Sequence, residues 1–333
     1  MALLDEALSR LLLRPTLADA TIENLTVLLL YIQFMPLTAD PSVDNQGSAA
    51  RSRYNDLSAF SILGVATRFA NFLNLPKLAP ASFEGDPQPV TESDVARMRV
   101  WINLTTCEAH LVLSSGLPSA LDTERTARVM PAFAENACAQ DLTSDRRVAG
   151  LLQMVEIVQQ AASSSGDPAA RSISAPALKR ANHRLDLWQE SWMPLLKDTP
   201  AQHCSIPFTS LRWYRFALNN TCLAPLLSSV NPELDNRGPL AFVQALDNSL
   251  TAASQILLSL SAAGSRYVWT VESQTAATFP PGEWQVDPDA IARFRFAVDS
   301  SWVTHTYATI FLVLCYTRKV IDGTPTLAPS AVA

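Results

Sequence analysis

Apolar side chains recur at helical spacing in one segment after another along this chain, and this periodicity limits the fold more than any other feature. No stretch of useful length alternates apolar and polar residues as a half-buried strand would. Only 10 of the 333 residues are glycine, which also favours helices over sandwiches or barrels. The sequence therefore predicts an all-α fold of about nine or ten helices with no sheet. The expected helices cover residues 2–13, 21–35, 53–74, 92–115, 143–162, 176–197, 208–229, 239–263 and 289–321.

Helix boundaries are marked by capping and breaking residues. Thr21 stands where an N-cap is expected before the second helix, and Asn24 occupies the place of its capping-box partner. The third helix is expected to end before Pro76. We expect residues 1–333 to form one large helical domain, and the Ser- and Gly-rich segment at 163–175 is where it would divide into two halves.

Charge and cysteine content exclude several classes of protein. The formal net charge is −6 and Lys and Arg form no dense run, so we expect no direct contact with DNA. Five cysteines without a C-x-x-C pair predict a reducing compartment and no zinc ribbon. The longest apolar run, at 308–316, is about half of the roughly 20 residues that a membrane span needs. We expect a soluble intracellular protein that does not engage a membrane.

The sequence contains no recognisable catalytic motif. It has no G-x-S-x-G, no G-x-G-x-x-G, no P-loop and no H-E-x-x-H. His203 and Cys204 are neighbours, but adjacent residues in an irregular stretch point apart and neither has a specified companion. His110 and His305 lie in apolar helices, where a core histidine is the ordinary interpretation. We therefore expect no catalytic residue, no metal site, no cofactor and no enzymatic activity.

The helix at 92–115 carries a carboxylate on an apolar stripe. Glu108 follows Trp101 and Leu104 at spacings that share one helix face. On the preceding helix Arg68 stands among small and apolar sequence neighbours, and Gly64 one turn earlier would permit a close approach. Because charges are seldom buried without a partner and consecutive helices are usually neighbours, we expect an Arg68–Glu108 ion pair between the two helices, with an architectural role.

The stretch from residue 96 to 122 reads ARMRVWINLTTCEAHLVLSSGLPSALD. It resembles the middle homology region of fungal zinc-cluster transcription factors, in which a helix reading roughly R-R-x-x-W-W-x-L-x-x-x-D-R is followed by G-R-P and an acid. The matching residues here occur in the same order. They are Arg97, Arg99, Trp101, Leu104, Glu108, Gly116, Pro118 and Asp122.

Neighbouring helices extend this resemblance. The segment RYNDLSAFSILGVATRFANFLNLPK looks like the family's small-residue helix, with Arg68 at its Arg position, and residues 21–34 look like the helix before it. The last helix, ending ATIFLVLCYTRK, resembles the family's last apolar helix. The chain looks closest to regulators of aromatic amino-acid catabolism, although departures from the motif leave the subfamily open. These departures are Asn74, Ile102, Glu108, Ala109 and Leu117.

The resemblance implies a nuclear transcription-regulatory domain of the zinc-cluster family, present here without the six-cysteine DNA-binding module. It implies a small-molecule effector bound between helices, together with other transcription proteins or a second copy as partners. Four polar or aromatic residues in apolar helices are the candidate pocket, although a packing role in the core is the more ordinary interpretation of each. They are Asn103, Cys107, Trp213 and His305. The alternative is a ligand-free scaffold for dimerisation or co-regulator docking.

Aromatic pairs leave the same two alternatives open. Trp188 and Trp192 are four residues apart, and Trp213 precedes Phe216 by three. Such pairs ordinarily pack a helix interface. They are also suited to line a pocket for a flat ligand.

Overall fold

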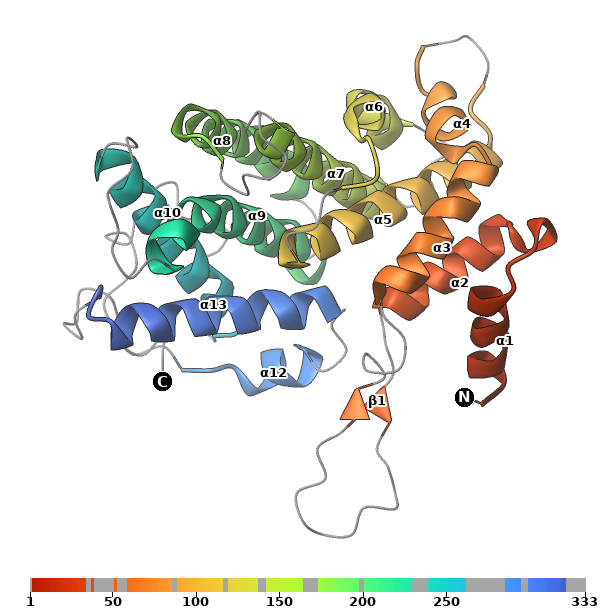
Figure 1. Cartoon of the computed structure of the whole chain (residues 1–333). Helices are drawn as coiled ribbons and strands as arrows, with labels where there is room; N and C mark the ends of the chain where they lie inside the picture. The colour runs from red at the N-terminus through yellow and green to blue at the C-terminus, as the bar shows by residue number, and fades with distance from the viewer. Residues whose placement is uncertain are drawn as a thin grey trace, which may run out of the picture. The chain divides into compact units, whose positions relative to one another are not determined.

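The chain is all-α, as predicted (Figure 1). The computed structural model describes residues 2–33, 37–38, 51–52, 59–85, 89–115, 119–136, 142–163, 173–197, 201–228, 239–261, 285–294 and 299–321. The α-helices of these ranges are α1 (Ala2–Leu13), α2 (Ile22–Gln33), α3 (Ala59–Phe72), α4 (Leu75–Ala81), α5 (Glu92–Ser115), α6 (Glu124–Glu135), α7 (Leu142–Ser163), α8 (Ala175–Lys197), α9 (Ala201–Ser228), α10 (Pro239–Leu258), α12 (Pro288–Phe294) and α13 (Asp299–Thr317). A 3₁₀ helix, η1 (Leu17–Asp19), lies between α1 and α2.

The extended structure of the described residues is slight. Strands β1 (Leu37–Thr38) and β2 (Arg51–Ser52) form one antiparallel pair, and Ser261 and Val286 form an isolated bridge. The all-α prediction therefore holds for the described residues, with this two-residue ladder as an exception to the expected absence of a sheet. Such a ladder is too short to be detected from sequence periodicity.

Several predicted boundaries are correct and three elements differ. The helix expected at 92–115 has these bounds, and Thr21 caps α2 by accepting a hydrogen bond from Asn24 N at 3.2 Å. The sequence did not predict α4 or α6, which contain Pro80 and Pro131, because proline was interpreted as a helix breaker. The long final helix is described as two helices, α12 and α13.

Asn74 joins α3 to α4 through a left-handed backbone conformation. Its φ is 55°, a region in which asparagine is one of the few non-glycine residues found routinely. This conformation turns the chain at the end of α3 and lets α4 begin directly at Leu75.

The chain divides into two compact units. Unit 1 comprises residues 1–152 with 298–300, and unit 2 comprises residues 153–297 with 301–333. The division lies within α7 rather than at 163–175, because the helix continues to Ser163 while its two halves belong to different units. The Ser- and Gly-rich sequence at 163–175, which suggested a division there, follows the end of α7 at Ser163.

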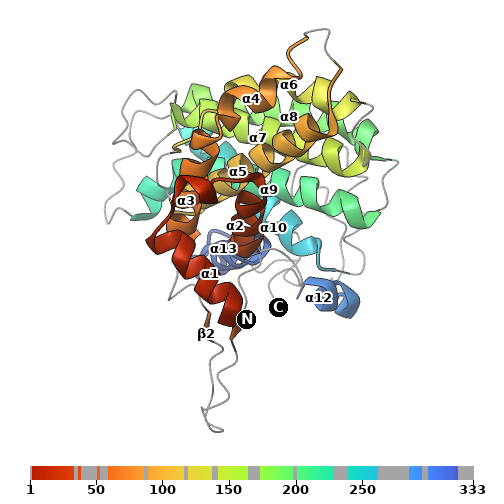
Figure 2. The ribbon, with the colours of Figure 1, turned by 90° about the vertical axis from the view of Figure 1, so that its right-hand side faces the viewer.

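Helix α5 is the centre of unit 1. It packs against α2, α3 and α4, and Figure 2 shows α3 beside α5. Its inner residues include Met98, Ile102 and Leu104, none of which has exposed surface. Burial of about 1.5–3 kcal/mol for each large apolar side chain makes this helix the main contributor to the core of the unit.

Helices α9 and α10 are the centre of unit 2. They share the most extensive contact among the described helices, and α8 packs on α9. Only ten residues join the end of α9 to the start of α10, so the two helices form an antiparallel hairpin. Small residues such as Ala252 and Ala253, neither of them exposed, allow the close approach of the helices.

Candidate functional site

Charged and aromatic residues of the α5 motif connect this helix to its surroundings in unit 1. Arg97 pairs with Asp94 at 2.5 Å. Arg99 binds both carboxylate oxygens of Asp145 at 2.7 Å, and the Asp145 side chain is almost fully buried. Trp101 is also buried and donates its indole N–H to Thr126 Oγ1 at 2.9 Å. Arg99 and Trp101 therefore link α5 to α7 and α6, which is an architectural role.

Glu108 binds the segment that follows α5, and the predicted ion pair with Arg68 is wrong. The carboxylate accepts hydrogen bonds from Ala120 N at 2.5 Å and from the Ser119 hydroxyl at 2.8 Å. Its residue is only 3% exposed. Burial raises the pKa of Glu108, while the hydrogen bonds from Ala120 and Ser119 act in the opposite direction. The buried acid thus fixes the chain after the helix end rather than docking α5 to α3.

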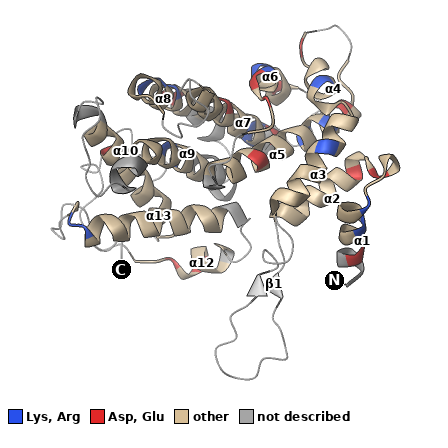
Figure 3. Ribbon diagram, viewed as in Figure 1, with Lys and Arg blue, Asp and Glu red and all other residues tan. Residues whose placement is uncertain are grey.

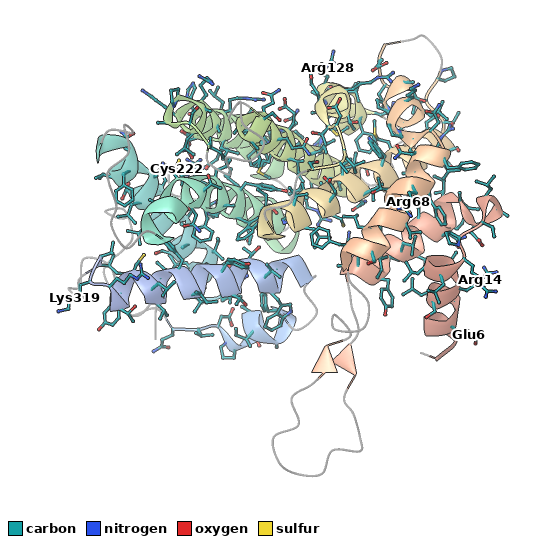
Figure 4. All side chains as sticks on the ribbon, viewed as in Figure 1. Glu6, Arg14, Arg68, Arg128, Cys222 and Lys319 are labelled. Carbon is teal, nitrogen blue, oxygen red and sulfur yellow. The ribbon has the colours of Figure 1, made fainter. Side chains whose placement is uncertain are left out.

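Arg68 lies on the outer face of α3 (Figure 4). The buried positions of this helix, including Ile62, Ala66 and Phe69, lie on the opposite side when each residue is advanced by about 100°. Helices α3 and α5 are in contact, so that part of the docking prediction is confirmed. Gly64 is exposed and a Cβ there would have no neighbour within 4 Å, so it does not mark a close approach.

The remaining motif positions are only partly described. Asp122 accepts a hydrogen bond from Glu124 N at 3.0 Å at the start of α6. Gly116 and Pro118 lie outside the described residues, as do the side chains of His203 and Cys204. The motif role of Gly116 and Pro118 stays a prediction.

The four predicted pocket residues fall into two pairs, one in each unit. Asn103 donates to Arg99 O at 2.8 Å along its own helix. Cys107 accepts a hydrogen bond from Gln33 Nε2 at 3.1 Å, and burial raises the pKa of its thiol to about 11. Asn103 and Cys107 belong to unit 1, whereas Trp213 and His305 belong to unit 2, and the pocket predicted from these four residues stays a prediction.

The other pair, Trp213 and His305, contributes to the interior of unit 2. The ring of Trp213 lies 5.9 Å from that of Tyr307 on α13, measured between centroids. His305 Nδ1 lies 2.7 Å from Ser301 O, and its Nε2 lies 3.1 Å from Ser259 Oγ. Burial lowers the pKa of His305, which favours the neutral ring. These two residues tie α13 to α9 and to the end of α10.

The Ser259–His305 contact has the composition of a nucleophile and a base. Ser259 follows the C-terminus of α10, where the helix dipole is negative. The next two backbone N–H groups, of Leu260 and Ser261, donate to carbonyls of α10 at 3.0 Å. An oxyanion forming beside Ser259 would therefore meet neither a free adjacent amide nor a favourable dipole. The geometry suits a link between helices better than acyl transfer.

Asn219 is a fully bonded hub of unit 2. It is completely buried, and it exchanges two amide hydrogen bonds with Asn182 of α8 at 2.9 and 3.0 Å. It also donates to Arg215 O at 2.8 Å and accepts from Asn248 Nδ2 of α10 at 3.3 Å. The contact between Asn219 and Asn248 sets the register of the antiparallel α9–α10 pair.

A stripe of polar residues runs along α10 from this hub. Asn248, Thr251, Gln255 and Ser259 follow one another at helical spacing on one face. The two ends of the stripe are bonded, Asn248 to Asn219 and Ser259 to His305. In the middle, Thr251 Oγ1 and Gln255 Oε1 are buried and make no hydrogen bond within the described part of the chain. We call Thr251 and Gln255 the middle of the polar stripe.

Buried cations of α9 lie at the level of this middle. The Asn219–Asn248 register places Arg212 opposite Gln255, since Arg212 precedes Asn219 by seven residues and Gln255 follows Asn248 by seven. Arg212 is 3% exposed. Burial, and then the neighbouring charge of Arg215, lower the pKa of Arg212 to about 9. Arg215 itself pairs with Asp186 at 2.7 Å.

Other candidate features of unit 2 are accounted for by packing. Trp188 and Trp192 stack on each other with centroids 6.0 Å apart, and Trp192 donates to Gln153 Oε1 at 2.7 Å. Glu156 pairs with Arg184 at 2.6 Å. These contacts fasten α8 to α7.

The described residues lack two further kinds of feature. No three His, Cys, Asp or Glu side chains among them are grouped as metal ligands would be. None of the described helices combines the length and apolar character needed to cross a bilayer.

The sequence contained a periodic signal for the middle of the polar stripe that did not enter the predicted set of site residues. Polar residues at i, i+3, i+7 and i+11 in the alanine-rich segment 239–263 form one face. Arg212 was recognisable in the same way, as a charged residue within the apolar helix predicted at 208–229. What the sequence could not supply is which of these groups find partners.

Comparison with known proteins adds no relative. No family model, no curated protein and no solved structure matches this chain.

Proposed function

We propose that this chain is the regulatory domain of a fungal zinc-cluster transcription factor and that it binds a small polar molecule between α9 and α10. In this proposal the domain acts in the nucleus without catalysing a reaction and without touching DNA itself. The order of motif residues along α2, α3 and α5 supports the family. The acidic net charge of −6 supports the absence of direct DNA contact.

The unpartnered middle of the polar stripe is the observation that carries ligand binding. A buried hydroxyl or amide oxygen without a hydrogen bond costs about 1–3 kcal/mol. Thr251 and Gln255 are only 3% and 7% exposed, so bulk water has little access to form hydrogen bonds with these two oxygens. Two such groups on adjacent turns, beside a satisfied hub, destabilise the unliganded domain. A ligand that bonds both would bind one state of the domain preferentially, which is how a ligand shifts a regulatory equilibrium.

Facing residues suggest the chemistry of the ligand. Gln255 Oε1 accepts, so it calls for a hydrogen-bond donor. Arg212 lies at the same level and keeps interactions of its own, and its guanidinium favours a carbonyl or carboxylate group. The ligand class is therefore a small molecule that carries a donor and a carbonyl or carboxylate acceptor together.

Thermal denaturation tests the binding proposal. Small amino acids, aromatic acids and hydroxy acids at millimolar concentration are added to the wild-type chain and to Gln255→Met, which removes the acceptor at similar volume. A binder present at about 100 times its Kd adds about 2.7 kcal/mol of stability. This stabilisation should be lost in Gln255→Met and kept in Thr221→Val, a matched control in α9. Equal stabilisation of all three proteins, or of none, would contradict the proposal.

A reporter assay tests the regulatory role separately. The chain is fused to a bacterial DNA-binding domain and expressed in yeast with a reporter that carries the matching operator. We expect the fusion to change transcription, and Gln255→Met to alter the response to the ligand found by thermal denaturation. A fusion that leaves transcription at the level of the DNA-binding domain alone would overturn the regulatory assignment.

A further inference from the structure

Polar residues of α8, α9 and α10 continue from the Asn219 hub in layers one turn apart. In the first layer after the hub, Asp186 of α8 pairs with Arg215 of α9 at 2.7 Å. Arg215 precedes Asn219 by four residues. Thr251 of α10 follows the hub contact at Asn248 by three, so in the antiparallel pair it lies at the level of Arg215. This layer therefore brings a carboxylate, a guanidinium and a hydroxyl to one level of unit 2.

Two complementary groups within this layer do not meet. Arg215 Nε is a donor, and the Thr251 hydroxyl can donate or accept. Both atoms are buried and make no hydrogen bond among the described residues. Because two such buried groups would gain stability by bonding to each other, they must lie further apart than a hydrogen bond reaches. A third group that bridges Arg215 Nε and Thr251 Oγ1 would satisfy both.

The positive charge of the site comes from α9. This helix contains Arg212 and Arg215 but no acidic residue, whereas α10 has no basic residue and one acid, the exposed Asp247 (Figure 3). Burial and the charge of Arg215 lower the pKa of Arg212 to about 9, so the two cations repel each other. The side chain of Asp186 is 49% exposed, so water weakens its compensating charge. A negatively charged bridging group is therefore favoured over a neutral one.

We propose that the ligand bound between α9 and α10 is a hydroxy acid in its anionic form, with its carboxylate between Arg215 Nε and the Thr251 hydroxyl. Both groups donate to the carboxylate, and the hydroxyl of the ligand donates to Gln255 Oε1, one turn further along α10. An amino acid is a poorer match, because its ammonium group would bring a third cation close to Arg212 and Arg215. This assignment rests on the proposed function, since it specifies the ligand of the same site.

Asp186 positions Arg215 without using its Nε. The carboxylate of Asp186 accepts a hydrogen bond from Arg215 Nη2. A guanidinium has five N–H donors, so the ligand shares Arg215 with Asp186 and does not displace it. Ligand binding should therefore leave the contact between α8 and α9 in place.

Isothermal titration calorimetry of the full chain tests the class of ligand. Two series of probes cover a small and a large side chain. They are lactate, lactamide and alanine, and 3-phenyllactate, 3-phenyllactamide and phenylalanine. In the series that fits the site, the hydroxy acid should bind at least about 10-fold more tightly than the amide and the amino acid.

The outcomes separate this assignment from the proposed function. Tighter binding of an amide or an amino acid would overturn the hydroxy-acid assignment and leave the ligand site in place. The same holds if none of the six probes binds to a chain that another compound stabilises against thermal denaturation. A chain that no compound stabilises would contradict the proposed function and the assignment together.

Substitutions on α10 test the two contacts. Thr251→Val removes the hydroxyl donor and leaves no buried hydroxyl unsatisfied, so the variant should stay folded and bind the hydroxy acid about 10-fold more weakly. The matched control Thr221→Val should leave the affinity unchanged. Gln255→Glu should reverse the preference, because its carboxylate attracts an ammonium group and repels a second carboxylate. An unchanged affinity in Thr251→Val, or an unchanged preference in Gln255→Glu, would overturn the proposal.

Discussion

Replacing Thr251 by valine should stabilise the unliganded protein. The hydroxyl of Thr251 is buried, with a residue exposure of 3%, and has no hydrogen-bond partner among the described residues. Valine keeps the shape of threonine and substitutes a methyl group for this hydroxyl. Removing an unbonded buried hydroxyl regains about 1–3 kcal/mol, and the added methyl contributes somewhat less than 1 kcal/mol. Because the neighbours adjust only partly, we expect a net gain of about 1–2 kcal/mol.

The control is Thr221→Val in the same unit. Thr221 Oγ1 donates to Leu218 O at 2.7 Å, so valine there removes a bond that threonine makes. Its half-buried position also reduces the benefit of the methyl group. We expect Thr221→Val to be neutral or to cost about 0.5–1 kcal/mol.

Urea denaturation measures both variants. Tryptophan fluorescence reports on unit 2 through Trp188, Trp192 and Trp213, which are all buried. The midpoint should rise for Thr251→Val and stay or fall for Thr221→Val, with unchanged slopes. If Thr251→Val costs as much stability as Thr221→Val, the Thr251 hydroxyl is bonded in solution. An unpartnered Thr251 hydroxyl, and with it the ligand proposed to bind it, would then be refuted.

Three further predictions concern unit 1. Asp145→Asn should lower the free energy of unfolding by about 2 kcal/mol, because it breaks the bidentate Arg99–Asp145 pair, in which Asp145 is buried. Arg68→Ala, at an exposed position, should change the free energy of unfolding by less than about 0.5 kcal/mol. Urea denaturation measures both variants. Burial raises the pKa of Glu108, so the folded state holds this proton more tightly than the unfolded state and stability falls as pH rises from about 4.3 through the raised pKa. Glu108→Gln should remove that fall, as seen in urea midpoints measured across this pH range, and an unchanged pH profile would contradict it. With its pKa raised to about 11, Cys107 should react with iodoacetamide at pH 8 about 100-fold more slowly than in the unfolded chain, as peptide mapping by mass spectrometry can determine.

Helical periodicity was sufficient to predict the fold class and most helix positions, because amphipathic spacing reflects how a helix is buried. It gave α5 its bounds and placed Trp101 and Glu108 on the buried face. Arg68 was misplaced because its immediate sequence neighbours were considered instead of its angle around the helix. The short helix α4 escaped detection because its prolines resemble breakers.

Partners in space could not be predicted in the same way. The residue that binds Arg99 is Asp145, which lies 46 positions further along the chain. Glu108 was predicted to be buried and paired, and burial was correct, but backbone and hydroxyl donors replaced the expected cation. A carboxylate can be satisfied by many donors, so its partner depends on how the following segment folds. The middle of the polar stripe is detectable only when the partners of every neighbour are known.

For the ligand site proposed between α9 and α10, the Asn182–Asn219–Asn248 hub separates the groups that would bind the ligand from those that set the register of the hairpin. Asn219 holds α9 and α10 in one register, and without it the alanine-rich contact would tolerate a slip of one turn, about 5.4 Å. Positions 251 and 255 lie beyond this hub, and Thr251 Oγ1 and Gln255 Oε1 make no hydrogen bond among the described residues. Substitutions at these two positions can therefore accumulate while the helices stay in place. Over evolution such a hairpin could acquire sensitivity to new molecules by changing two side chains on an otherwise constant frame.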